Sequence, residues 1–236
     1  MSAEQTGRSG ERDLARTLAG WSLIAAPLLL LLWNALDPAT SDHAAERLTQ
    51  IDDNGPRFIA AGYLGLIGVW AFVPGLIGFW QLFRGPRITL GQVGTGLLLI
   101  GIITTTAFFG FGIYEYEAAQ LELDRAQMAK LADNVEAPSA VAIPLLVVFL
   151  VGVVLGSLIV AWSLWRRHIV PVWSPIAIVL GTILNFIADS AVLSATSWAF
   201  ALVGFGWVGV TLLRMTDEEW DRRGRPAEPL ESPTAA

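Results

Sequence analysis

Six long stretches without a charged side chain constrain this chain more than any other feature. They cover residues 18–36, 58–83, 89–114, 141–165, 172–188 and 192–213, with lengths of 19, 26, 26, 25, 17 and 22 residues. All 15 basic and all 21 acidic residues of the 236-residue chain lie outside them. A helix needs about 20 mostly apolar residues to cross the hydrocarbon of a bilayer. The sequence therefore predicts an integral membrane protein and excludes a soluble α/β enzyme and a nucleic-acid-binding protein.

The apolar stretches are continuous, which favours helices over barrel strands. Hydrocarbon offers no hydrogen bonds to the backbone, so spanning segments are either helices or a closed barrel. Barrel strands would be short segments with alternating polarity. We predict an all-α bundle of six transmembrane helices, forming one domain over residues 14–216. The polar residues 1–13 and 217–236 are predicted to be disordered cytoplasmic tails.

The basic residues are distributed unequally between the two sides of the predicted bundle. Eleven lie in the two tails and in the second and fourth links, whereas the other three links carry four basic and twelve acidic residues. Lys and Arg in short links stay in the cytoplasm. We therefore expect both termini in the cytoplasm and the acidic links outside the plasma membrane. Trp33 occupies a position where a signal-peptide cleavage site needs a small residue, so we expect the first helix to be retained.

Each of the two long acidic links predicts a short outer helix. In residues 37–57, Thr40 or Ser41 can cap a helix. Its apolar face is formed by Ala44, Ala45, Leu48 and Ile51. In residues 114–138, the corresponding face is formed by Ala118, Leu121, Met128 and Leu131, and Pro138 ends the helix. Anionic lipid headgroups repel acidic segments, so we expect both helices to cover the bundle.

Amide and acidic side chains gather where three of the predicted helices reach the outer face. They are Asn34, Asp37, Glu115, Glu117, Asn185 and Asp189. A helix C-terminus is partially negative, so acids there favour a bound cation or a paired arginine, for which Arg57 is a candidate. These residues predict a binding site for a cation or solute, with Asn185 as its best member because an amide inside the membrane needs a partner.

Other interpretations of these polar residues stay open. Asp189 or Ser190 can simply cap the last helix, and the third helix can continue past Glu117, which would remove the dipole argument. Gly152-x-x-x-Gly156 predicts close helix packing, either within the bundle or across a dimer seam. Pro74 predicts a kink, which is structural or part of a transport site.

Two segments indicate an internal repeat. Residues 75–84 (GLIGFWQLFR) and 157–166 (SLIVAWSLWR) share Leu, Ile, Trp, Leu and Arg at equal spacing. One interpretation is that the two segments descend from one unit. The other is convergence, because Trp and Arg both favour the cytoplasmic interface.

The residue inventory gives little support to an enzyme. The chain has no cysteine, both histidines lie outside the apolar stretches, and neither a metalloprotease motif nor a phosphate-binding loop is present. We expect no catalytic residues, no metal and no cofactor. We predict a non-enzymatic membrane component, acting as an accessory subunit or scaffold, with membrane lipids and a second copy or another membrane protein as partners. The alternatives are a small transporter or channel and, least favoured, a lipid-modifying enzyme.

The stretch Asn54-Gly55-Pro56-Arg57-Phe58 and residues 73–84, VPGLIGFWQLFR, resemble a known group of sequences. They are similar to six-span membrane proteins of unknown function from high-GC Gram-positive (actinobacterial) bacteria. The resemblance covers about the first half of the chain. It implies a cytoplasmic N-terminus, an acidic first outer link and a basic inner turn containing proline. It implies no catalytic residue.

Overall fold

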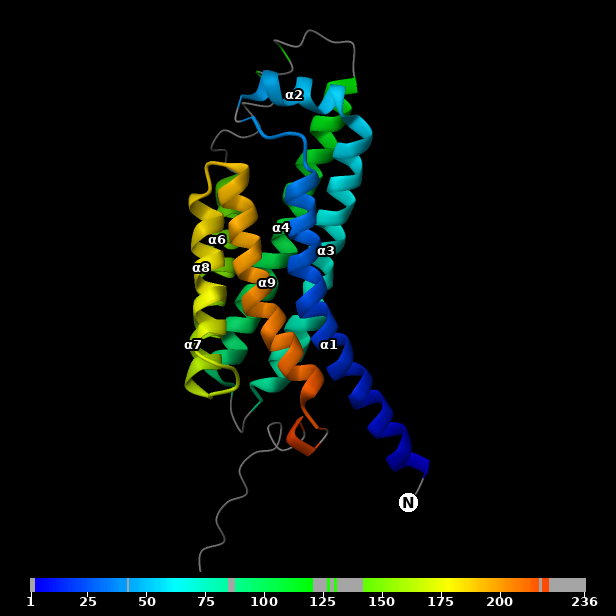
Figure 1. Cartoon of the computed structure of the whole chain (residues 1–236), viewed down its shortest axis with the longest axis vertical. Helices are drawn as coiled ribbons and strands as arrows, with labels where there is room; N and C mark the ends of the chain where they lie inside the picture. The colour runs from blue at the N-terminus through cyan, green and yellow to red at the C-terminus, as the bar shows by residue number, and fades with distance from the viewer. Residues whose placement is uncertain are drawn as a thin grey trace, which may run out of the picture.

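The described part of the chain is built from helices and their connections. A computed structural model describes residues 3–41, 43–84, 88–120, 127, 130, 142–216 and 218–220, and for residues 3–13, 111 and 142 it describes the backbone alone. None of these residues forms a strand, so the predicted all-α class is confirmed for the described part. The helices are α1 (Ala3–Leu36), α2 (Ala44–Asp53), α3 (Gly55–Leu82), α4 (Leu90–Gln120), α6 (Ala142–Leu150), η1 (Val151–Leu155), α7 (Gly156–Arg166), α8 (Trp173–Ile187) and α9 (Ala191–Arg214). Figure 1 shows an elongated bundle with α2 lying across one end.

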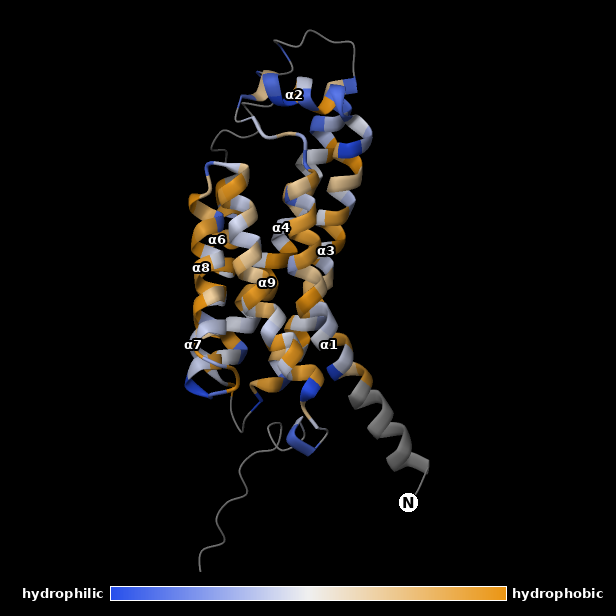
Figure 2. Ribbon diagram, viewed as in Figure 1, coloured by the Kyte–Doolittle hydropathy of each residue, from blue (hydrophilic) through white to orange (hydrophobic). Residues whose placement is uncertain are grey.

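Within the part of the chain that the structure describes, five helical segments are long and apolar enough to cross a membrane. They are Leu14–Leu36, Gly55–Leu82, Leu90–Gln120, Ile143–Arg166 and Ala191–Arg214, and each corresponds to one predicted stretch. The remaining stretch, 172–188, corresponds to α8, whose 15 residues span about 22 Å where the hydrocarbon is about 30 Å thick. Apolar residues cover the length of the bundle and polar residues mark its ends (Figure 2). The helices therefore fit a multi-pass membrane protein.

Two helices extend by more than one turn beyond the apolar stretches that predicted them. We expected residues 1–13 to be a disordered tail, but α1 begins at Ala3 and includes residues 3–13. Helix α4 continues through Glu115 and Glu117 to Gln120. Hydropathy indicates which part of a helix is surrounded by lipid. It does not indicate where the helix ends, because the backbone hydrogen bonds of a helix also form in water. The rest of the predicted outer helix over 114–138, except residues 127 and 130, and residues 221–236 of the second tail lie outside the described residues.

Small residues bring the central helices together. Helix α1 packs against α3 and α9, α8 packs against α9, and α4 packs against α3 and α7. A Cβ atom added at Gly68 of α3 would lie 3.0 Å from Leu30 of α1, and one added at Gly209 of α9 would lie 2.5 Å from the backbone oxygen of Gly20. In lipid, where apolar surface gains nothing from burial, such close approach is the main source of helix association.

The fourth apolar segment is interrupted by one π-helical turn. Helix α6 passes into η1 and then into α7 without a break. At this turn, an added Cβ on Gly152 would lie 2.6 Å from the Cα and N of Gly101 in α4. An added Cβ on Gly156 would lie 2.5 Å from the backbone N of Leu98 in the same helix. The glycine pair thus contacts a helix of its own chain.

Helix α2 lies over the end of the bundle at which α1 ends and α3 begins (Figure 1). Leu48 and Ile51 are buried, as the predicted apolar face requires, while Ala45 is exposed. Ser41 lies before the N-cap position and does not cap the helix. Its Oγ accepts a hydrogen bond from the N–H of His43 and donates one to Glu46. His43 is the N-cap residue and makes no side-chain capping bond.

Candidate functional site

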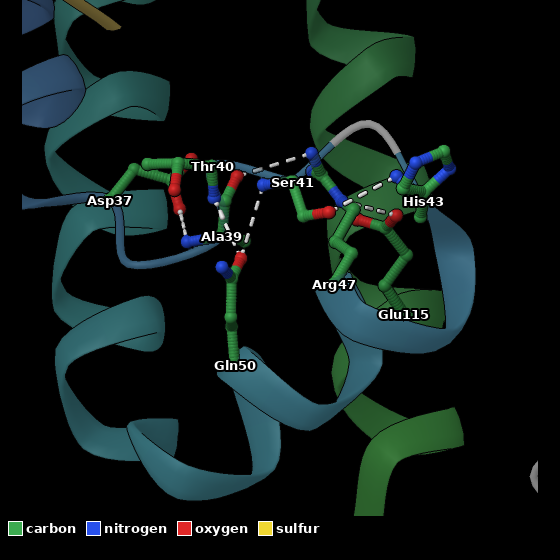
Figure 3. Close-up of polar contacts among 8 residues, drawn as sticks. All are labelled: Asp37, Ala39, Thr40, Ser41, His43, Arg47, Gln50 and Glu115. Atoms are coloured by element: carbon green, nitrogen blue, oxygen red, sulfur yellow. Dashed lines mark hydrogen bonds and ion pairs between the residues drawn. The ribbon is translucent and has the colours of Figure 1, made fainter.

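An arginine–glutamate pair joins α2 to α4. Arg47 Nε donates to Glu115 Oε1 at 2.8 Å, and a second guanidinium nitrogen donates to Oε2 at 3.0 Å. Arg47 also donates to the carbonyl of Ala39 at 3.3 Å. The Arg47 side chain is 32% exposed and that of Glu115 is 11% exposed. A bidentate pair of this kind is stronger and more directional than an ordinary surface ion pair, so it fixes α2 over α4 (Figure 3).

The segment between α1 and α2 is held by short polar contacts. Asp37 Oδ1 accepts a hydrogen bond from the N–H of Ala39 at 2.9 Å, and Gln50 Oε1 accepts from the N–H groups of Thr40 and Ser41 (Figure 3). Burial raises the pKa of the Asp37 carboxyl above its ordinary value of 3.8. The hydrogen bond from Ala39 and the positive charge of Arg47 oppose this rise in pKa but do not cancel it.

Arg57 acts at the end of α1 in two ways. We expected Arg57 to pair with the acids at the helix ends; its positive charge lowers the pKa of the Asp37 carboxyl, but its Nε donates a hydrogen bond to the carbonyl of Leu36 at 2.7 Å and not to a carboxylate. It therefore neutralises the C-terminus of α1 through the backbone, and the arginine that pairs with a predicted acid is Arg47. Because α4 continues to Gln120, Glu115 lies more than one turn before the end of the helix, and the dipole argument does not apply to it.

A cavity of about 750 Å³ lies next to the Arg47–Glu115 pair. It is formed between α1, α2, α3, α4 and α6. Its polar lining residues other than tyrosines are Asp37, Arg47, Glu115 and Glu117. The rest of the lining is mostly aromatic and aliphatic: Trp33, Phe58, Ile59, Gly62, Tyr63, Leu66, Phe108, Phe109, Gly112, Ile113, Tyr114, Tyr116, Ile143, Leu145 and Leu146. An apolar cavity with a few polar groups at one end is the usual form of a small-molecule site.

Tyr114 contributes an unsatisfied polar group to this lining. Its hydroxyl oxygen is buried and has no hydrogen-bond partner among the described residues. The buried Thr106 Oγ1 and Trp198 Nε1 also lack a partner there, but neither residue lines the cavity. Buried hydroxyls are nearly always hydrogen-bonded in folded proteins, so the Tyr114 hydroxyl has an unused capacity for a bond at this place.

The structure brings together only part of the predicted site. Asp37, Glu115 and Glu117 line the cavity, whereas Asn34, Asn185 and Asp189 do not. Asn34 donates to the Ser194 hydroxyl at 2.7 Å, and so links α1 to α9.

The remaining predicted residues belong to the hairpin between α8 and α9. Asn185 Oδ1 accepts from the Ser197 hydroxyl at 3.4 Å. Asp189 is exposed, and Ser190 caps α9 by accepting from the N–H of Leu193 at 3.3 Å. Among the described residues, no group of three or more His, Asp and Glu side chains is placed to hold a metal ion.

Sequence reasoning missed Arg47 as a member of the site. It lies beside Leu48, on a helix whose apolar face was recognised, and it is the only basic residue of the short acidic helix. An isolated arginine next to a buried position, together with an acid at the end of an apolar stretch, was the available signal.

One comparison with known proteins assigns the chain to a family. Residues 22–219 match DUF6796, a family of unknown function, so the chain belongs to this family. No curated protein and no solved structure matches the chain.

Proposed function

We propose that the protein is a non-enzymatic component of the plasma membrane, acting as a scaffold or accessory subunit. In this proposal six helices, α8 included, cross the bilayer, and both termini lie in the cytoplasm. The distribution of arginine supports the orientation, because the links at the end opposite α2 and the two tails carry most of the basic residues.

The observation that carries the non-enzymatic role is the way polar groups of the apolar helices are used. Asn34 donates to the Ser194 hydroxyl of α9 at 2.7 Å. Asn185 Oδ1 lies 3.4 Å from the hydroxyl of Ser197 of α9, which also donates to the Ser194 carbonyl at 2.6 Å. Thr104 Oγ1, Thr105 Oγ1 and Thr182 Oγ1 donate to carbonyls of their own helices. Transport and proton relay use ionisable groups within the membrane, and the predicted spanning stretches of this sequence contain no Asp, Glu, Lys or Arg. The asparagines therefore contact a neighbouring helix or hairpin arm, and the three threonines bond within their own helices, so none of these five side chains is left over for a ligand.

The orientation is tested by labelling single cysteines, for which the cysteine-free sequence is already suited. Asn54→Cys and Asp189→Cys should react with a membrane-impermeant maleimide in intact cells. Ile88→Cys and Val172→Cys should react only after the cells are permeabilised. All four positions are exposed in the structure. Labelling of Val172→Cys and Asp189→Cys from the same side would show that α8 does not cross the membrane.

The function is tested with the full chain in liposomes. We expect cation flux and phospholipid turnover to equal those of protein-free liposomes. Flux that Asp37→Asn or Glu117→Gln abolishes would overturn the proposal in favour of a transporter, which is the second candidate because acids line one end of the cavity. Lipid products that disappear with Glu115→Gln would instead identify a lipid-modifying enzyme.

A further inference from the structure

The cavity under α2 has the size of a ligand site. Its volume of about 750 Å³ lies within the range of about 300–1,000 Å³ that is typical of such sites. Here five helices contribute to the wall, and none of them fills the space.

The cavity is accessible from the region of the acyl chains. Tyr63 and Ile113, which line it, are 63% and 66% exposed, and they belong to α3 and α4. Ile143 and Leu146 of α6 also line it and are exposed. All four residues lie in segments apolar enough to cross a membrane. A ligand that dissolves in the bilayer can therefore reach the cavity without crossing water.

The polar end of the cavity favours a positive charge. Asp37, Glu115 and Glu117 line it together with Arg47. Arg47 is committed to Glu115 and to a backbone carbonyl, while Glu117 is exposed. Arg57 lies near Asp37 but outside the lining, so the acids outnumber the arginines even when it is included. An anionic headgroup would meet net repulsion here.

The aromatic lining and the Tyr114 hydroxyl point in the same direction. Trp33 and Phe109 are packed with their ring centroids 5.3 Å apart at the wall. Aromatic faces attract ammonium groups and also accept apolar chains. The Tyr114 hydroxyl has no partner among the described residues, so it is available to a polar group of a ligand.

We propose that this cavity binds a cationic amphiphile, a molecule with one apolar chain and an amine or quaternary ammonium head, which enters from the membrane. The head lies among Asp37, Glu117 and the aromatic rings, and the chain occupies the apolar part beside Gly62. This site is additional to the scaffold role and does not depend on it.

The test measures binding of three dodecyl amphiphiles to the purified full chain in a neutral maltoside detergent. The probes are dodecyltrimethylammonium, dodecylphosphocholine and dodecyl phosphate, and binding is followed by calorimetry. We expect the cation to bind at least about tenfold more tightly than the anion, which corresponds to about 1.4 kcal/mol. Equal affinities for the cation and the anion would overturn the proposal.

Matched variants locate the site. At both Gly62 and Gly110 an added Cβ meets no described atom within 4 Å, but only Gly62 lines the cavity. Gly62→Leu should reduce cation affinity at least about tenfold, and Gly110→Leu should leave it unchanged. Unchanged binding by Gly62→Leu would refute the location.

A charge variant decides the question independently of the cavity-filling one. The double variant Asp37→Asn, Glu117→Gln should lose the preference for the cation while keeping the elution profile of the native protein. If the preference survives in this variant, the acidic end does not recognise the head, and the proposal fails even where Gly62→Leu proves to be misfolded.

Discussion

The close contact between Gly152 and Gly101 allows the packing of this bundle to be tested by adding a single carbon atom, in the variant Gly152→Ala. An added Cβ at Gly152 would lie 2.6 Å from two backbone atoms of Gly101 and 2.8 Å from the carbonyl oxygen of Leu97. Carbon atoms in contact are about 3.5–4.0 Å apart, so in Gly152→Ala the two helices must separate by about 1 Å. The obstacle is backbone, which cannot rotate away as a side chain can. Overpacking of this kind costs about 1–3 kcal/mol.

A second glycine variant isolates this packing cost. Replacing a helical glycine by alanine favours the helix by about 1 kcal/mol, and this gain is common to Gly152→Ala and Gly110→Ala. At Gly110 the new Cβ meets no described atom within 4 Å. The difference in unfolding free energy between the two variants should therefore equal the overpacking cost, about 1–3 kcal/mol in favour of Gly110→Ala.

The assay is equilibrium unfolding by dodecyl sulfate in mixed micelles, followed by circular dichroism, with the oligomeric state measured in parallel. Equal stabilities of Gly152→Ala and Gly110→Ala would refute the argument. If Gly152→Ala instead leaves unfolding unchanged and abolishes a dimer, the motif is a seam between two copies.

Three further predictions concern the residues at the α2 end. Because folding raises the pKa of Asp37, ionisation of this carboxyl lowers the free energy of unfolding as the pH rises above 3.8. Asp37→Asn should therefore be more stable than the native protein at neutral pH and equally stable in acid, as measured by melting curves over this range. A less stable Asp37→Asn protein at neutral pH would contradict the raised pKa. Glu115→Gln should lower the free energy of unfolding by about 1–2 kcal/mol. In a double-mutant cycle, the variant that combines Glu115→Gln with Arg47→Ala should lose less stability than the sum of the two single variants. Additive losses would mean that the pair does not interact. Ser190→Ala removes the N-cap of α9 and should lower the free energy of unfolding by about 1 kcal/mol. Asp189→Ala is the control and should change stability little. Equal melting temperatures of these two variants would exclude a capping role for Ser190.

Composition and periodicity were sufficient to predict where the apolar helices lie. Charge-free stretches identified the apolar parts of α1, α3, α4, α7 and α9, because a charged side chain is expensive in hydrocarbon. The face of α2 was also predictable, since Leu48 and Ile51 recur at helical spacing. The ends of the helices were less predictable, because α1 begins before and α4 continues beyond its apolar stretch. The π turn at Val151–Leu155 has no recognisable pattern in the sequence, because it reflects how two backbones meet.

Partners across long sequence distances were not predictable. Arg47 and Glu115 are 68 residues apart, and Asn34 and Ser194 are 160 apart. Which acid an arginine reaches depends on the direction in which α2 folds back over α4, and hydropathy carries no information about that direction. Of the predicted residues, Asp37, Glu115 and Glu117 therefore line one cavity, whereas Asn34, Asn185 and Asp189 lie outside it.

The glycines of α3 show where the helices pack closely and where the cavity lies. At Gly68 and Gly75 an added Cβ would lie 3.0 and 2.7 Å from Leu30 and Leu23 of α1, whereas at Gly62 it would meet no described atom within 4 Å. The same residue type therefore marks a tight contact along most of the helix and an open space near α2. What differs is the neighbour: the rings of Trp33 and Phe109, which pack on each other, would be in contact with a Cβ atom added at Gly65 of α3. Gly62, about one turn nearer to α2, lines the cavity instead. The aromatic pair therefore packs against α3 at the edge of the open space.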